Sequence, residues 1–181
     1  LEVEEVRCWW KIVFSESDLL HLEFLMSITI SLNADQIQTL DLSPALDAIE
    51  PMLAKIREYE QQVQFKIDYP LEPGDPREFS EVPEVRLWFI RLDAVFPWMP
   101  FLLDWKTGEL GRYAAMLVPH QFMPKEGIEY NPEALEIFVM QKTFVLMGWL
   151  KQNEIESRSR LKAMTKTLGY ELDDGFFVML E

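Results

Sequence analysis

Two short stretches of the chain alternate between apolar and polar side chains, and the segment between them has helical spacing. Residues 27–32 read "SITISL", and residues 63–69 read "VQFKIDY". Every second residue in each stretch is apolar, which is typical of a strand with one buried face. A strand, a helix and a second strand predict a βαβ unit, or a short sheet with a helix packed on it.

The helix between these strands is expected to begin at Ser43-Pro44, with Ser43 as the N-cap and Pro44 at the first helical position. Apolar and aromatic residues then follow at steps of three and four. The inward positions are expected to be Leu46, Ile49, Leu53, Ile56 and Tyr59. Pro51 lies inside this pattern, so we expect the helix to kink or restart there.

The remainder of the chain favours helices. Residues 84–96, "EVRLWFIRLDAVF", fit a helix, although their apolar centre also fits a buried strand. Ser80, Glu81 and Glu84 favour a helix start there. Asn131-Pro132-Glu133 predicts another helix, mostly buried, as far as about Gln152. Another helix is expected from Ser157 to Leu168, closed by Gly169. A short apolar segment, helix or strand, is expected to end the chain.

These elements predict a helix-rich α/β (α+β) domain. A small N-terminal sheet with a βαβ-like unit is followed by a C-terminal helical bundle that begins near residue 84. We expect one globular domain over residues 26–181, because the regular patterns start at Met26. Residues 1–25 are expected to be a leader that is non-native or poorly ordered, with a genuine N-terminal helix as the alternative. No function is therefore assigned to Cys8, Trp9 or His21.

Charge and composition exclude several classes of function. The 181 residues carry a formal charge of −14, which disfavours nucleic acid and anionic membranes as partners and suits a basic partner. One cysteine and two histidines cannot build a standard zinc or iron–sulfur site, so no metal or cofactor is expected. The longest apolar run, residues 137–150, is interrupted by Gln141 and Lys142, so a membrane span is not expected.

One stretch concentrates side chains that active sites use. Residues 104–122 read "DWKTGELGRYAAMLVPHQF" and include Asp104, Lys106, Arg112, Tyr113 and His120. On a helix over residues 107–118, Tyr113 shares the apolar face, whereas Glu109 and Arg112 can form an ion pair on the opposite face. The three interpretations are an amphipathic helix, a partner-binding surface, and a polar pocket of a small enzyme or ligand-binding protein.

Two further charged segments have ordinary interpretations. Arg158, Arg160, Lys162 and Lys166 form the basic cluster of the chain, expected as a solvated stripe that could also contact an acidic partner. Residues 70–84 form a loop rich in proline and acidic residues, expected to be a connector or, alternatively, a docking loop. Adjacent acids such as Asp173 and Asp174 are expected by chance in so acidic a chain.

Three long strings resemble the chlororespiratory reduction 6 family of cyanobacteria and plastids. They are "PEVRLWFIRLDAVFPWMPFLLDWKTGELGRYAAMLVPHQF", "EGIEYNPEALEIFVMQKTFVLMGWL" and "SRSRLKAMTKTLGYELDD". The resemblance extends from Met26 to the C-terminus. The leader does not resemble a transit peptide, which favours a cyanobacterial protein in the cytoplasm; a plastid homologue would be stromal.

The resemblance implies a non-enzymatic assembly factor for the photosynthetic NAD(P)H dehydrogenase-like complex, which is related to complex I. Its implied partner is the unassembled, iron–sulfur-bearing subunit I of the peripheral arm. No catalytic residues are carried over from the family. As a hypothesis, the partner-binding residues are Trp98, Asp104, Trp105, Lys106, Arg112, Tyr113, His120, Gln121 and Tyr130.

Overall fold

The computed structural model describes residues 27–105, 108–118, 120–123, 127–130 and 132–180. The expected leader, residues 1–25, lies outside the described residues. The N-terminal half contains β1 (Ile28–Asn33), α3 (Ala34–Gln38), α4 (Ser43–Ile49), the 3-10 segment η1 (Glu50–Tyr59) and β2 (Val63–Asp68). It continues with η2 (Phe79–Glu81), α5 (Pro83–Val95) and η3 (Met99–Phe101). The C-terminal half contains α6 (Glu109–Leu117), β3 (His120–Met123), β4 (Gly127–Tyr130), α7 (Pro132–Gln152), α8 (Arg158–Thr167) and α9 (Asp174–Val178).

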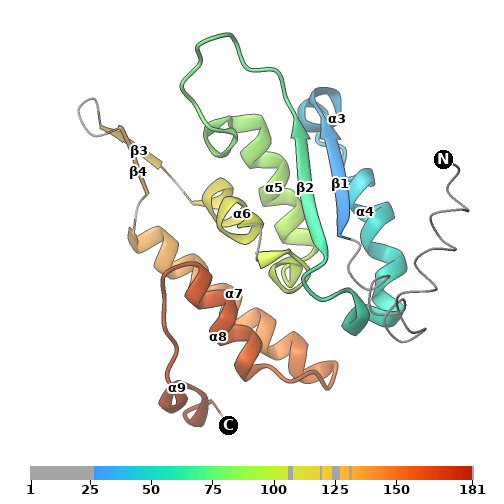
Figure 1. Ribbon diagram of the computed structural model, residues 1–181, viewed down its shortest axis with the longest axis vertical. Helices are drawn as coiled ribbons and strands as arrows, with labels where there is room; N and C mark the ends of the chain where they lie inside the picture. The colour runs from blue at the N-terminus through green and yellow to red at the C-terminus, as the bar shows by residue number, and fades with distance from the viewer. Residues whose placement is uncertain (1–26, 106–107, 119, 124–126, 131, 181) are drawn as a thin grey trace, which may run out of the picture.

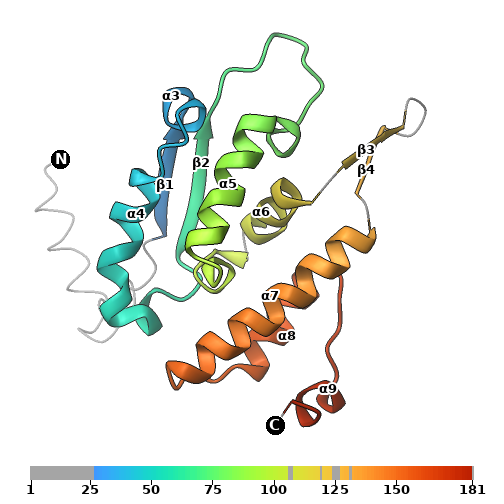
Figure 2. The ribbon, with the colours of Figure 1, turned by 180° about the vertical axis from the view of Figure 1, so that it is seen from behind.

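The elements are arranged as successive layers (Figure 1). β1 and β2 lie side by side, with α3 and α4 at the β1 side and α5 beside β2. α6 lies beyond α5, and the long helix α7 runs with α8 along the far side. Seen from behind, α5, α6 and α7 keep this order, and α9 lies on the side of α8 away from the sheet (Figure 2). The helix-rich α/β class predicted from the sequence is confirmed.

β1 and β2 form the predicted parallel pair, in register from Ile28 opposite Val63 to Asn33 opposite Asp68. The chain returns to this sheet at residues 101–104. The Val63 amide donates a hydrogen bond to the Leu102 carbonyl at 2.7 Å, and the Asp104 amide donates one to the Val63 carbonyl at 2.9 Å. The start of β2 is therefore hydrogen-bonded on both sides.

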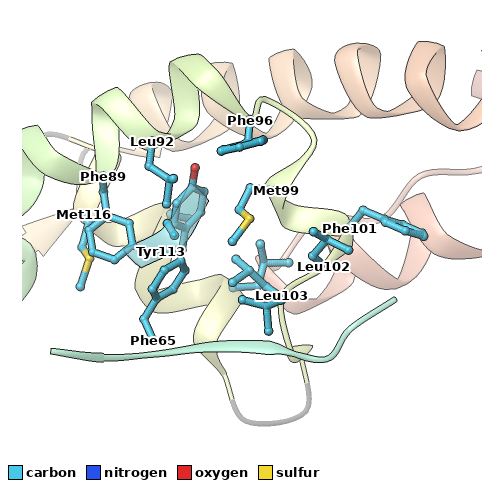
Figure 3. Packing of buried hydrophobic residues seen from close by; sticks show 14 of the residues in the cluster. Phe65, Phe89, Leu92, Phe96, Met99, Phe101, Leu102, Leu103, Tyr113 and Met116 are labelled. Carbon is cyan, nitrogen blue, oxygen red and sulfur yellow. The ribbon is translucent and has the colours of Figure 1, made fainter. Parts of the chain in front are cut away.

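The sheet is buried on one face. Ile30, Leu32, Val63 and Phe65 are buried, whereas the residues between them are exposed or partly exposed, as the alternating pattern predicts. Phe65 meets Phe89 of α5 edge-to-face, with ring centroids 5.0 Å apart. Figure 3 shows this core, where side chains from β2, α5, η3 and α6 converge around Tyr113.

The segment after Ser43 departs from the prediction in two ways. The N-cap is Leu42, with Ser43 inside the helix; the Asp41 carboxylate instead accepts the Ser43 amide at 2.9 Å. The α-helix ends before Pro51, which confirms the expected interruption, and continues as a 3-10 segment with a kink at Lys55. A 3-10 turn holds three residues, so the α-helical spacing fails and Leu53 is exposed rather than inward.

The helix predicted over residues 84–96 is confirmed as α5, but its start differs. Pro83 is the first helical residue, and Val82 holds the N-cap position without a side-chain bond. Ser80 lies in η2, where it is buried. α3 and the hairpin of β3 and β4 were not predicted at all; in the hairpin, His120 pairs with Tyr130.

α7 ends at Gln152 as predicted, but the prediction that it is mostly buried is wrong. Phe138, Val139, Leu146 and Leu150 face the core, whereas other large apolar side chains of this helix face solvent. α8 covers most of the expected range. The Ser157 side chain does not cap it; the Glu156 carboxylate accepts the Ser159 amide instead, at 3.0 Å. Gly169 follows with a φ of +86°, as expected of a helix-closing glycine.

Candidate functional site

Arg112 and Tyr113 are neighbours in sequence, but Arg112 lies on the exposed side of α6 and Tyr113 on its buried side. The Arg112 side chain is 56% exposed and lies 3.8 Å from the Glu109 carboxylate, which confirms the predicted pair. Tyr113 is buried in the core, edge-to-face with Phe89 at 5.6 Å between centroids. The helix therefore separates two residues that a shared polar pocket would have to bring together.

Asp104 and Trp105 lie where the chain leaves the sheet. The Asp104 backbone takes part in the pairing with Val63, and its side chain is partly exposed. The Trp105 indole is buried and donates a hydrogen bond to the Pro100 carbonyl at 2.7 Å. This hydrogen bond stabilises the turn at Pro100.

The side chains of the remaining expected site residues are not described. Lys106 lies outside the described residues. His120, Gln121 and Tyr130 belong to the β3–β4 hairpin, with Gln121 opposite Glu129, and only their backbone positions are described. The hairpin extends beyond the ends of α6 and α7 (Figure 1).

Trp98 connects the turn after α5 to α7. Its ring stacks on Trp149 with centroids 5.0 Å apart and an interplanar angle of 18°. Phe96 meets Trp98 edge-to-face at 5.3 Å. Both tryptophans are partly exposed, so this aromatic stack is at once a helix contact and part of the surface.

A polar cluster missed by the sequence analysis lies among α5, α6 and α7. Lys142 of α7 forms an ion pair with the Asp93 carboxylate of α5, and its side chain is only 3% exposed. The same carboxylate oxygen accepts the Tyr113 hydroxyl at 2.7 Å. The available signal was Lys142 itself, a cation within an otherwise apolar run, but nothing in the sequence identified its partner.

The electrostatics of this cluster follow from burial around Tyr113. Desolvation, with the adjacent Asp93 charge, raises the pKa of the Tyr113 hydroxyl well above its ordinary value of 10.0. The hydroxyl therefore stays protonated and remains a hydrogen-bond donor to Asp93. One carboxylate with two donors from two other helices fixes how α5, α6 and α7 pack together.

The basic cluster on α8 is partly or largely exposed, in keeping with the expected solvated stripe, and most of its members also have partners within the chain. Lys162 donates to the Asp174 carboxylate of α9 at 2.7 Å, and Arg160 pairs with Glu60 at 2.8 Å. Arg158 and Lys162 also lie over the Phe177 ring, 5.3 and 5.8 Å from its centroid. These contacts hold α9 against α8.

α7 was expected to be mostly buried, but a line of its residues lies on the solvent side. It consists of Ile137, Gln141, Phe144, Val145 and Gly148, and we name it the α7 stripe. Ile137, Phe144 and Val145 are 69%, 46% and 36% exposed. Phe144 lies 6.1 Å from Phe176 of α9 between centroids, so the α7 stripe continues towards the C-terminal helix. Three large apolar side chains exposed along one side of a helix form a candidate interaction surface.

The described residues also bear on metal sites and membrane spans. Within the described ranges, His, Cys, Asp and Glu form no group of three or more that could hold a metal ion. The helices of those ranges include none long and apolar enough to cross a membrane.

Comparison with known families shows to which protein family the chain belongs. The family described as chlororespiratory reduction 6 matches residues 32–179, which include every described element from the end of β1 to α9. The chain belongs to the chlororespiratory reduction 6 family. Membership of this family implies a role in assembly of the NAD(P)H dehydrogenase complex. No solved structure matches the chain.

Proposed function

We propose that this protein is a non-enzymatic assembly factor that binds the unassembled, iron–sulfur-bearing subunit I of the peripheral arm of the photosynthetic NAD(P)H dehydrogenase-like complex. The observation that carries this proposal is the family match over residues 32–179. The factor acts in the cyanobacterial cytoplasm, or in the stroma for a plastid homologue, and it leaves before the complex is complete.

The surface of the protein is compatible with holding a client. The chain carries a charge of −14, which attracts a basic client and repels an acidic one. Exposed apolar side chains on α7 offer contact area. Of the residues expected to contact the client, Trp98, Asp104 and Arg112 have partly or fully exposed side chains, and their contact with the client is a proposal.

Two of the residues expected to contact the client stabilise the fold instead. Tyr113 and Trp105 are buried, and each donates a hydrogen bond within the protein. Substituting either one would disturb the fold before it affected a contact with the client. Their role in binding is therefore indirect, through the packing of α6 and of the turn at Pro100.

The proposal is tested by affinity purification of the tagged chain from a cyanobacterial lysate, followed by mass spectrometry. Recovery of subunit I with incomplete peripheral-arm intermediates, and without the mature complex, supports an assembly factor. Recovery of the mature complex in stoichiometric amounts would instead identify a permanent subunit. Recovery of no subunit of the complex after mild crosslinking would contradict the proposal.

A further inference from the structure

The α7 stripe has the geometry of a helix-binding surface. Ile137, Gln141, Phe144 and Gly148 follow one another at steps of four, three and four, so they form a nearly straight line along one side of a helix. The opposite side of α7 is packed in the core through Leu146 and Leu150. A ridge of this spacing fits the groove of a second helix.

Gly148 is not explained by the packing of the described chain. Among the described residues, no atom from another part of the chain lies within 4 Å of a Cβ placed on Gly148. Glycine inside a helix is about 1 kcal/mol less favourable than alanine, so the folded chain would be more stable with a side chain there. A glycine at such a place allows the backbone of another helix to approach closely.

Charge around the stripe indicates what the partner carries. Glu136 precedes Ile137, and Glu133 lies one turn before it; both acids are exposed. Lys142, which interrupts the same apolar run, is buried and paired with Asp93, so its charge does not face the stripe. The exposed Lys151 lies one turn after Gly148, at the opposite end of the stripe from Glu136. Lysine or arginine side chains of a partner would be favourable at the end of the stripe nearest Glu136.

We infer that the α7 stripe docks an amphipathic helix of the client, with apolar side chains over Ile137 and Phe144 and basic side chains towards Glu136. Phe176 of α9, next to Phe144, forms one edge of this surface. The inference rests on the proposed function, because it assigns the surface through which the same client is held. A second copy of this chain is a poor occupant, since two molecules of charge −14 repel each other.

The test measures binding of purified subunit I to the full chain and to matched variants. Ile137→Ser removes an exposed apolar side chain from the stripe, and Ile90→Ser removes one that is 43% exposed on α5. We expect Ile137→Ser to weaken binding about tenfold, because it removes a large apolar contact from the interface, and Ile90→Ser to leave binding within about twofold.

Gly148→Gln separates binding from folding. Glutamine is a good helix former and has open space at this position, so we expect a higher melting temperature. The same side chain blocks the close approach of a partner helix, so we expect weaker binding. Glu136→Lys is expected to weaken binding at low salt and to have less effect at high salt. Unchanged binding by Ile137→Ser and Gly148→Gln would overturn the inference.

The possible failures are distinguishable. If the wild-type chain binds subunit I and all stripe variants bind equally well, the proposed function stands and the docking surface lies elsewhere. If the wild-type chain does not bind subunit I, the proposed function fails, and this inference fails with it. If analytical ultracentrifugation shows a dimer that Ile137→Ser dissociates, the stripe is an interface between two copies and the inference is overturned.

Discussion

Lys142 of α7 and Asp93 of α5 form an ion pair in which the lysine is almost fully buried and the carboxylate is 21% exposed. The carboxylate also accepts the Tyr113 hydroxyl, so residues from three helices meet at one oxygen atom. Removing one partner of a buried ion pair is costly because it leaves the other charge unpaired, whereas replacing both partners together costs much less. Replacing any one residue of the cluster is therefore expected to destabilise the protein.

Lys142→Met is expected to lower the free energy of unfolding by about 2 kcal/mol, because it leaves the Asp93 charge with one partner fewer. Partial solvation of Asp93 keeps the loss below that of a fully buried pair. Urea denaturation measures the change. Lys151→Met, at an exposed position of the same helix, is the control and is expected to change stability by less than about 0.5 kcal/mol.

The double variant Asp93→Asn with Lys142→Met tests the pairing itself. We expect it to be less destabilised than the sum of the two single variants, because each single variant already removes the ion pair. A strictly additive result would show that the two side chains do not interact in solution.

Tyr113 gives the protein a pH dependence at alkaline pH. Its folded-state pKa is raised above 10.0, so its contribution to stability is complete below pH 10. As pH rises above that value, the unfolded chain releases a proton that the folded chain retains, and stability falls by up to about 1.4 kcal/mol per pH unit. We expect Tyr113→Phe to remove this part of the slope. Equal slopes for both proteins in urea titrations at pH 9–11 would contradict the assignment.

Asp174 attaches α9 to α8 in a pH-dependent way. The hydrogen bond from Lys162, with the charge of that lysine, lowers the pKa of the Asp174 carboxyl below its ordinary value of 3.8. The attachment is therefore complete above that value and is lost as pH falls through the folded-state pKa. At neutral pH, we expect Asp174→Asn to speed amide hydrogen exchange in α9. Glu171→Gln, at a neighbouring exposed acid, should leave the exchange rates unchanged.

Two glycines are expected to respond to alanine in opposite directions. Gly148→Ala should stabilise the chain by about 0.5–1 kcal/mol, because α7 gains helix propensity and the new methyl group meets open space. Gly169→Ala should destabilise it by about 1 kcal/mol, because φ is +86° at that position. Thermal unfolding of both variants checks the two signs, and a loss of stability in Gly148→Ala would show that the glycine serves the fold itself.

The sequence predicted those elements whose residues follow a regular pattern of apolar and polar side chains over a short stretch. The strands were found because Ile30 and Leu32 alternate with polar residues, and this alternation specifies a face. The position of Leu53 was wrong because a change from α to 3-10 geometry depends on packing around Pro51 rather than on spacing. The β3–β4 hairpin has strands of four residues, which is too short for a reliable alternation.

The candidate site depended on contacts between distant parts of the chain. Arg112 was placed correctly on the polar face of its helix and Tyr113 on the apolar face, because helical spacing groups each of them with residues three and four positions away. The partner of Lys142 could not be found, since Asp93 is one of many acids and only tertiary packing selects it. The outward face of α7 was missed because this helix is apolar on all sides, and periodicity then gives no orientation.

The pairing of β2 with β1 on one side and with Leu103 on the other has a consequence for folding kinetics. Parallel neighbours cannot be joined by a tight turn, so each pairing brings together residues that are far apart in the sequence. The entropy of closing those loops is lost before the contacts at Val63 can form. We therefore expect the folding rate to be limited by assembly of this small sheet, although helices make up most of the molecule.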